Sequence, residues 1–280
     1  MSSARSTRTV RSAGSAGSAG PAAGAVTLRR LAWAGVEVAA GDVRVVIDAL
    51  KNPADLAGFQ GMPRRPLPSI EAAPGVRTHA FVTHLHPDHC DRRLLAGIAA
   101  GEGCTVGCHT PIAGVLAEMG VEAVPQEMGE RRQIGPFTTI PVPSHDWRGD
   151  DQVAWIVEGP GLRIIHFGDT IWHGKWWEIA RDYGPFDVAF LPIAGVMARR
   201  EGITPTNQPA TLTPEQAVEA AVVLEASTAC AIHYDLFNNP PYYTEQHDVR
   251  GRFLRAARAR GIHGIAPGDG EAVPFAAAAA

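Results

Sequence analysis

Residues 84–91 form a run in which three imidazoles and two carboxylates stand close together. These side chains are among the ligands that hold zinc, iron and manganese in proteins. The run follows the apolar, strand-like stretch 80–83, and Pro87 disfavours a continuous helix through it. A loop leaving a strand end can instead turn these side chains towards one point. A polar turn with hydrogen-bonded histidines is the alternative, but it leaves the density of donors unexplained, so the sequence predicts a metal site.

Further donors follow other strand-like segments along the chain. They are His145 after 137–142, Asp169 after 162–167, and His233 after 228–232. Open α/β proteins place their sites at the carboxyl ends of strands. The positions of these three side chains therefore make them candidates for the same site as the run 84–91.

Strands and helices alternate along the chain, which predicts an α/β fold. The strands are expected at 26–38, 43–48, 76–83, 105–108, 137–142, 153–157, 162–167, 186–191 and 228–232. The helices are expected at 92 to about 100 behind the cap Asp91, at 111–119, from Pro214 onward, and at about 244–259. Thr213 and Gln216 have the spacing of a capping box at the third helix. Periodicity alone does not choose between the α/β layer folds.

Two segments have compositions that disfavour regular structure. Residues 51–75 contain five prolines and three glycines, which predicts a long loop that is either a lid over the metal site or a surface insertion. Residues 1–25 contain Ser-Ala-Gly three times in succession and read as a disordered tail. We therefore expect one metal-binding domain over residues 26–275.

The spacing of the run resembles the signature of the metallo-β-lactamase superfamily, His-x-His-x-Asp-His. Its four positions in this chain are His84, His86, Asp88 and His89. Three later segments resemble elements of the same family and occur in the family's order. They are Pro143–Asp146, Phe167–Thr170 and Ala231–Tyr234. The resemblance covers about residues 27–275.

The resemblance implies an αββα sandwich of two mixed β-sheets flanked by helices, with the metals at one sheet edge. It also implies a ligand set. One metal would be held by His84, His86 and His145, a second by Asp88, His89 and His233, and Asp169 would bridge the two. Two divalent cations about 3.5–4 Å apart can share a hydroxide and lower the pKa of its parent water towards neutrality. All seven donors offer nitrogen or oxygen, so zinc is the first choice, with manganese or iron as alternatives.

The function implied is a metal-dependent hydrolase that cleaves an ester-type bond, with Asp88 positioning the nucleophile. Segments 191–195 and 213–218 resemble the branch of ascorbate-6-phosphate lactonase-like enzymes and phospholipases D acting on N-acyl-phosphatidylethanolamine, which implies a lactone or a phosphodiester. The chain departs from that branch in the segment Trp33–Val36, which lacks the histidine often found there, and at Ala49, where proline is common. The alternatives are a non-catalytic metal-binding protein and an iron-dependent redox protein of the same fold.

Several residues near the candidate ligands have two interpretations each. His79 and His166 lie in strands as core residues, or His166 orients a ligand near Asp169. His173 either faces substrate or packs, and Cys90 reads as a small buried residue rather than a ligand. For six aromatic residues the two interpretations are a pocket wall and core packing: Trp147, Trp172, Trp176, Trp177, Tyr242 and Tyr243. For four arginines the two interpretations are recognition of an anionic group and a solvated surface position: Arg64, Arg65, Arg199 and Arg200.

The composition limits the partners. The chain has 280 residues, 45% of them hydrophobic, and a net charge of −4, which argues against a nucleic-acid-binding surface. Four cysteines in a chain of this length make no disulfide scaffold, so we expect reduced thiols and a cytoplasmic location. No apolar run is long enough to cross a bilayer. The expected partner is a small-molecule or lipid-like substrate, with a homo-oligomer left open.

Overall fold

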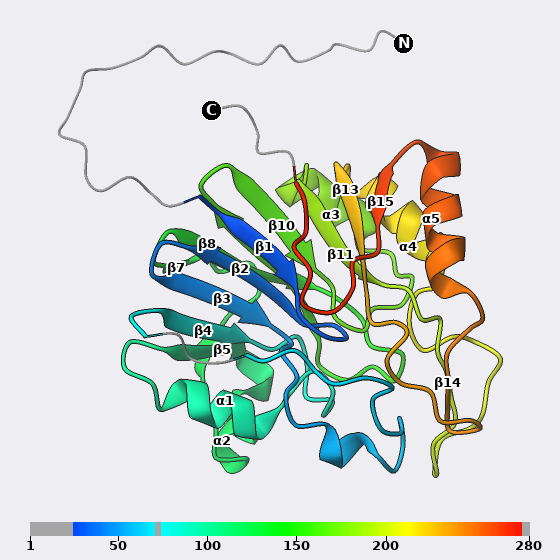
Figure 1. The fold of residues 1–280 in the computed structure, drawn as a ribbon, viewed down its shortest axis with the longest axis horizontal. Coiled ribbons are helices and arrows are strands. Elements are labelled where there is room, and N and C mark those ends of the chain that lie inside the picture. The colour runs from blue at the N-terminus through cyan, green and yellow to red at the C-terminus, as the bar shows by residue number, and fades with distance from the viewer. Residues whose placement is uncertain (1–24, 71–73, 276–280) are drawn as a thin grey trace, which may run out of the picture.

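The structure is a computed structural model that describes residues 25–70 and 74–275. In this part of the chain two β-sheets pack face to face, and helices cover the outer face of each (Figure 1). This arrangement confirms the predicted αββα sandwich of two mixed sheets. Apart from Ala25, the predicted tail lies outside the described residues, and so do the alanines at 276–280.

The first sheet has six strands that lie side by side in sequence order. They are β1 (Thr27–Arg30), β2 (Val36–Ala40), β3 (Val43–Ile47), β4 (Arg77–Phe81), β5 (Thr105–His109) and β6 (Val124–Gln126). Strands β1 to β3 pair antiparallel, whereas β3 to β6 pair parallel. Because β3 and β4 are parallel neighbours, their carboxyl ends reach the same edge of the sheet.

The second sheet has seven strands. They are β7 (Arg132–Ile134), β8 (Phe137–Pro143), β9 (Val153–Gly159), β10 (Leu162–His166), β11 (Val188–Pro192), β13 (Thr228–Ile232) and β15 (His263–Ile265). Their order is β15-β13-β11-β10-β9-β8-β7, parallel from β15 to β10 and antiparallel from there to β7. A separate antiparallel pair consists of β12 (Met197–Ala198) and β14 (Tyr243–Thr244).

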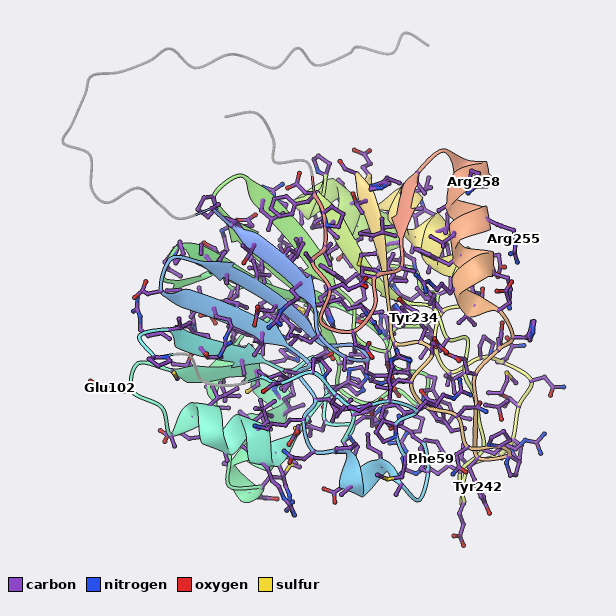
Figure 2. The ribbon with its side chains drawn as sticks, in the orientation of Figure 1. Phe59, Glu102, Tyr234, Tyr242, Arg255 and Arg258 are labelled. Carbon is purple, nitrogen blue, oxygen red and sulfur yellow. The ribbon has the colours of Figure 1, made fainter. Side chains whose placement is uncertain are left out.

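The helices form the two outer layers. They are α1 (Arg92–Ala99), α2 (Ala113–Glu118), α3 (Trp176–Tyr183), α4 (Pro214–Val223) and α5 (Val249–Arg260), with 3-10 turns at Pro53–Leu56 and Thr110–Ile112. Helix α5 packs Phe253 inward, while Arg255 and Arg258 project from its outer face (Figure 2). None of the helices in the described part of the chain has the length and hydropathy that a bilayer crossing requires.

Side-chain alternation along the strands creates three apolar layers. In β3, Val45 faces the core between the sheets and Val46 faces α1 and α2. In β10, Ile164 faces the same central core and Ile165 faces α3 to α5. Successive residues of a strand point to opposite faces, so a strand buried on both faces is apolar throughout. The site is left to the ends of the strands, where polar residues begin.

Two helix starts agree with their sequence signals. Asp91 caps α1 by accepting a hydrogen bond from the backbone N–H of Leu94 at 3.1 Å. Thr213 and Gln216 form both halves of the capping box at α4. Each cap satisfies backbone donors that a helix otherwise leaves unpaired. Local chemistry was therefore enough to place these two helices.

Other boundaries were predicted wrongly. The expected strand 26–38 is two strands, because the chain reverses between Leu31 and Gly35 and Trp33 adopts a positive φ of 57°. The expected helix 244–259 begins only at Val249 in α5, because residues 243–244 belong to β14. Elements that were not predicted are α3, β6, β7, β12, β14 and β15. Most of these strands are short and take their stability from neighbours distant in sequence.

A buried arginine fixes the end of the described chain to the first strand. The Arg30 guanidinium is fully buried and pairs with Asp269 at 2.7 Å. It also donates to the carbonyl oxygens of Pro267 at 3.0 Å and Trp33 at 3.2 Å, and it lies 4.5 Å above the ring of Tyr234. A buried charge is tolerated only with partners of this kind. Arg30 therefore joins β1, the 31–35 turn and the 267–269 segment.

Replacing Arg30 with methionine should destabilise the protein by about 1–3 kcal/mol, since the buried carboxylate of Asp269 then keeps Arg65 but loses its contact with Arg30. The control is Arg29→Met, which removes a partly exposed pair with Glu37 and should cost about 0–1 kcal/mol. Urea unfolding measures both variants. Equal midpoints for the two variants would contradict the assigned role of Arg30.

Candidate metal centre

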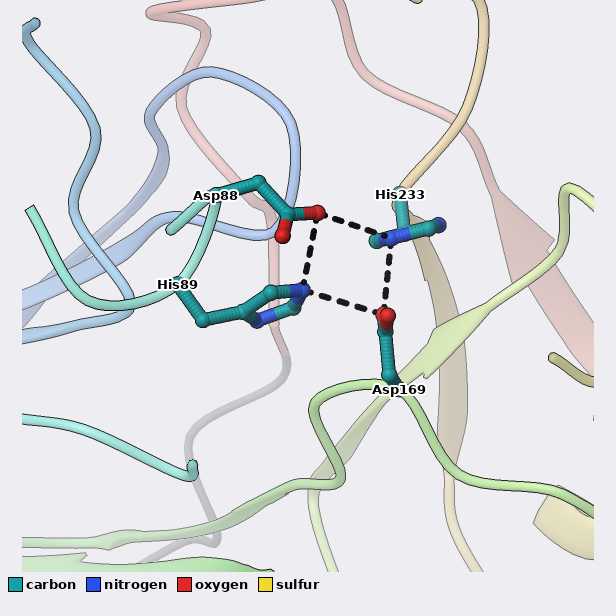
Figure 3. A group of neighbouring side chains, drawn as sticks. All are labelled: Asp88, His89, Asp169 and His233. Carbon is teal, nitrogen blue, oxygen red and sulfur yellow. Dashed lines mark ion pairs between the residues drawn. The ribbon is translucent and has the colours of Figure 1, made fainter. Parts of the chain in front are cut away.

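The donors predicted from sequence come from strand ends that meet at one edge of the sandwich. The run 84–91 follows β4 of the first sheet, whereas Asp169 follows β10 and His233 follows β13 of the second. Figure 3 shows four of these side chains facing one another across the gap between the sheets. The site is thus assembled from both sheets, as expected when strand ends supply the ligands.

Four buried side chains form the tighter group of donors. The Asp169 Oδ1 atom lies 2.7 Å from His233 Nε2 and 3.0 Å from His89 Nε2. The Asp88 Oδ2 atom lies 3.6 Å from His233 Nε2 and 3.4 Å from His89 Nε2 (Figure 3). Two carboxylates and two imidazoles therefore surround one point, which is the donor set of a divalent transition metal.

A second group of donors shares Asp169 with the first. It consists of His84, His86 and Asp169, whose ligand atoms lie within 4.8 Å of one another. The rings of His84 and His86 have centroids 4.4 Å apart. Asp169 is therefore the residue that the two groups have in common.

Unpartnered atoms test whether these residues fit a metal. The Nε2 atoms of His84, His89 and His233 and the Oδ1 atom of Asp169 are buried without a hydrogen-bond partner. The short contacts to Asp169 Oδ1 bring the charges together without the alignment that a hydrogen bond requires. Buried polar atoms without partners are costly and rare. Cations bound by the two groups would satisfy these four atoms, so the donor set fits a metal centre.

The charges of the group agree with this fit. Burial, together with the charges of His89 and His86, lowers the pKa of His84 to about 3, so its ring is neutral and able to ligate. Burial alone would raise the pKa of Asp169, but His233 and His89 hold it well below its usual range. Asp169 is thus a carboxylate at neutral pH. Both residues have the protonation state that a metal ligand needs.

Excess negative charge is concentrated around His89. Burial lowers the pKa of this imidazole, but three neighbouring carboxylates raise it well above its usual range. These carboxylates belong to Asp169, Asp88 and Asp48. The centre therefore favours a positive charge, either on a protonated imidazole or on a bound cation.

Asp48 is a supporting residue that the sequence interpretation missed. It is fully buried, and its Oδ2 atom lies 2.7 Å from His89 Nδ1. It also accepts hydrogen bonds from the backbone N–H and the hydroxyl of Thr83, and that hydroxyl contacts His84 Nδ1 at 2.9 Å. Asp48 thereby directs Nε2 of His89 towards the centre, as carboxylates behind metal-binding histidines do. An acid directly after a strand that neighbours β4 was the signal available.

Trp33 is a second supporting residue, and the sequence had marked it only as a departure from a family pattern. Its indole N–H donates to Asp88 Oδ2 at 2.9 Å, and its ring lies 3.9 Å from the ring of His233. Its carbonyl oxygen accepts the backbone N–H of His233 at 2.9 Å. Trp33 is completely buried and holds a positive φ, a conformation that persists only where surroundings enforce it.

Two further residues, Gln60 and His166, support the donors together with Asp48 and Trp33. Gln60, from the long loop, donates to Asp88 Oδ2 at 2.7 Å. The Nε2 atom of His166 contacts the carbonyl oxygen of Ala34 at 2.7 Å, and its Nδ1 accepts the N–H of Gly168, next to Asp169. His166 therefore connects the 31–35 turn to the Asp169 segment. Burial raises the pKa of the Cys90 thiol to about 12, which keeps it protonated and unlike a metal ligand.

His145 lies apart from these donor groups. Its side chain is exposed, its ring centroid is 4.8 Å from that of His173, and His173 stacks on Trp176 at 4.2 Å. The neighbouring Asp146 is buried and forms a third group of possible ligands with His86 and Asp150. Burial raises the pKa of Asp146, and the charge of His86 opposes this effect. The ligand role of His145 remains a prediction.

A small cavity opens beside the donors. It has a volume of about 90 Å³ and is lined by Asp88, Asp169 and His86 on the polar side, with Phe59 and Tyr243 among its other walls. Phe59 and Tyr242 lie on the same side of the molecule in Figure 2. The long loop thus reaches the site through Phe59 and Gln60.

A larger hollow of about 790 Å³ adjoins the small cavity and shares three lining residues with it, Trp147, Arg148 and Thr211. Trp172 also lines the hollow, whereas Trp176 is fully buried in the core and Trp177 is exposed. Of the tryptophans considered for a pocket wall, Trp147 and Trp172 have that position. Of the four arginines considered for an anion, Arg200 lines the small cavity, while Arg64 and Arg65 form ion pairs elsewhere.

Comparison with known proteins adds a family match. A family model described as the beta-lactamase superfamily domain matches residues 43–234. An uncharacterized protein from Mycobacterium tuberculosis is 25% identical over 207 residues, which cover 68% of this chain and 52% of that protein. The chain thus spans about half the length of that relative.

Two further comparisons concern a relative and a solved structure. A protein from Enterococcus faecalis named UPF0173 metal-dependent hydrolase is 28% identical over 196 residues, which cover 65% of this chain and 80% of that protein. The crystal structure of a possible metal-dependent hydrolase from Veillonella parvula has a TM-score of 0.68 and 18% identity, covering 89% of this chain and 99% of that chain. At this identity the structural likeness shows the fold alone.

Asp48→Asn should weaken metal binding by about 10–100-fold, because His89 loses the carboxylate that orients its ring. The matched control is Asp42→Asn, which changes an exposed carboxylate paired only with Arg77 at the start of β4. Competition with a chromogenic chelator measures the affinity. An unchanged affinity in Asp48→Asn would show that the ring of His89 is oriented without Asp48.

Proposed function

Because this chain belongs to the beta-lactamase superfamily, we propose that it is a metal-dependent hydrolase. One observation carries the proposal: two groups of donors share Asp169, and most of their ligand atoms are buried without a hydrogen-bond partner. The unpartnered atoms belong to His84, His89, His233 and Asp169. The proposed ligands of one cation are Asp88, His89 and His233, and those of the other include His84 and His86. The sequence predicts His145 as a further ligand of the cation held by His84 and His86.

The proposed chemistry divides between the cations and the protein. When bound, divalent cations would acidify a water molecule and polarise the bond under attack. The protein would hold Asp88 in place, because Trp33 and Gln60 both donate to its Oδ2 atom. Burial alone would raise the pKa of Asp88, but His89 and His233 hold it well below its usual range. Asp88 therefore acts as a fixed carboxylate that accepts a hydrogen bond and orients the nucleophile.

The proposed substrate is a small or lipid-like molecule with an ester-type bond, either a lactone or a phosphodiester. The 90 Å³ cavity beside the donors has room only for the reacting group. The rest of the substrate would lie in the adjoining hollow, where Trp147 and Trp172 offer apolar surface beside the Arg148–Asp150 ion pair. This division supports a substrate with a compact reactive head and a larger remainder.

The alternatives make different demands on the same site. A non-catalytic metal-binding protein would bind the cations with no turnover of any ester. An iron-dependent redox protein would need iron as its native metal and would be inactive with zinc. Metal identity and hydrolysis measured on one preparation separate the three.

The test of the proposal is the metal content of the wild type and of Asp169→Asn. We expect about two metal ions per chain in the wild type and fewer than about one in the variant, with loss of hydrolysis on a panel of lactones and phosphodiesters. Asp182→Asn, an exposed carboxylate on α3, is the control and should retain both properties. Elemental analysis and a continuous hydrolysis assay give the readouts.

Two results would overturn the proposal. A well-folded wild type that takes up no zinc, manganese or iron would remove the metal centre. A wild type that binds metal but hydrolyses no ester in the panel, while retaining metal-dependent redox activity, would replace the hydrolase with the redox protein.

A further inference from the structure

The carboxylate of Asp146 lies next to His86 and has one oxygen without a hydrogen-bond partner. The residue is 3% exposed, and its Oδ2 atom is buried without a hydrogen-bond partner. The other oxygen, Oδ1, accepts the backbone N–H of Arg148 at 2.7 Å, which fixes the orientation of the carboxylate. The free Oδ2 atom lies 3.7 Å from His86 Nδ1. A buried anionic oxygen aimed at a candidate ligand calls for a cation.

The backbone decides which of two neighbouring residues can face the centre. After β8, successive side chains differ in burial: Ser144 is buried, His145 is exposed and Asp146 is buried. Two contacts fix this alternation against the Asp169 segment. The Ser144 hydroxyl donates to the carbonyl oxygen of Phe167, and the carbonyl oxygen of His145 accepts the N–H of Ile171. A one-residue shift that brought His145 to the place of Asp146 would break both contacts.

The contacts of His86 complete the arrangement. Its Nε2 atom lies 2.9 Å from Asp150 Oδ2, and Asp150 is in turn held by Arg148. A carboxylate on one ring nitrogen directs the other nitrogen to a metal, so Asp150 leaves Nδ1 as the ligating atom. Two ligand atoms on one cation are about 3.0–3.4 Å apart when each bond is about 2.1 Å. The 3.7 Å between His86 Nδ1 and Asp146 Oδ2 is close to that separation.

We propose that Asp146, rather than His145, is the third protein ligand of the cation held by His84 and His86. The inference rests on the metal centre of the proposed function. It makes the full donor set four imidazoles and three carboxylates. A donor set with more carboxylates suits manganese and iron(II) better than one with more imidazoles. The position held by His84, His86 and Asp146 should therefore bind these metals as readily as zinc.

The experiment compares metal binding of the wild type, His145→Ala, Asp146→Asn and Asp151→Asn. Asp151 is an exposed carboxylate in the same segment and serves as the matched control. Each protein is dialysed against zinc or manganese and analysed for metal per chain, and the visible spectrum of the cobalt(II) form reports the ligands directly. Urea unfolding checks that each variant is folded.

The expected result is about two ions per chain in the wild type, His145→Ala and Asp151→Asn, and about one in Asp146→Asn. The cobalt spectrum should change in Asp146→Asn alone. His145→Ala replaces an exposed side chain, so its metal content is informative even if Asp146→Asn folds poorly. As a further check, Asp146→His combined with His145→Ala should hold the second ion that Asp146→Asn loses.

Different metal contents would contradict the hydrolase proposal and the assignment of Asp146 as a ligand. A wild type without metal overturns the metal centre and this inference together. A wild type with about two ions, in which Asp146→Asn keeps both and His145→Ala loses one, overturns the assignment of Asp146 and leaves the hydrolase proposal standing.

Discussion

The burial of several carboxylates at one point is the constraint on which the rest of the site depends. Asp48, Asp88 and Asp169 lie within a few residues of strand ends and are almost completely shielded from water. Charges this deep are tolerated only where donors or cations surround them. The sandwich meets this demand by bringing together strand ends of both sheets, so each carboxylate finds imidazole, indole, hydroxyl or amide partners supplied by another segment.

Much of the fold could be predicted, and so could most of the donors that meet at the candidate site, because their signals are local. The run 84–91 shows its donors within eight residues, and Thr213 with Gln216 marks a helix start by side-chain chemistry alone. The supports were missed for the opposite reason. Asp48 meets His89 only because β3 and β4 are parallel neighbours, and Trp33 meets Asp88 only because a turn with positive φ carries it inward.

The region after β8 offers two neighbouring candidate ligands. The sequence predicts His145, the more familiar type of ligand, whereas we propose Asp146. The choice between them depends on which residue has the inward position, and that depends on hydrogen bonds to Phe167 and Ile171. Side-chain type indicates what can bind a metal, whereas the register of the neighbouring segment decides what does.

The Arg30 contacts have a consequence for how the protein is made. The guanidinium reaches Pro267, 237 residues further along the chain, and the same guanidinium holds the carbonyl oxygen of Trp33 beside His233. All seven sequence-predicted donors precede residues 267–269 in the chain and are therefore synthesised first. The support that Arg30 gives to Trp33 beside His233 would be incomplete until residues 267–269 follow and pack against it, and any earlier metal uptake would occur in a looser and less selective environment.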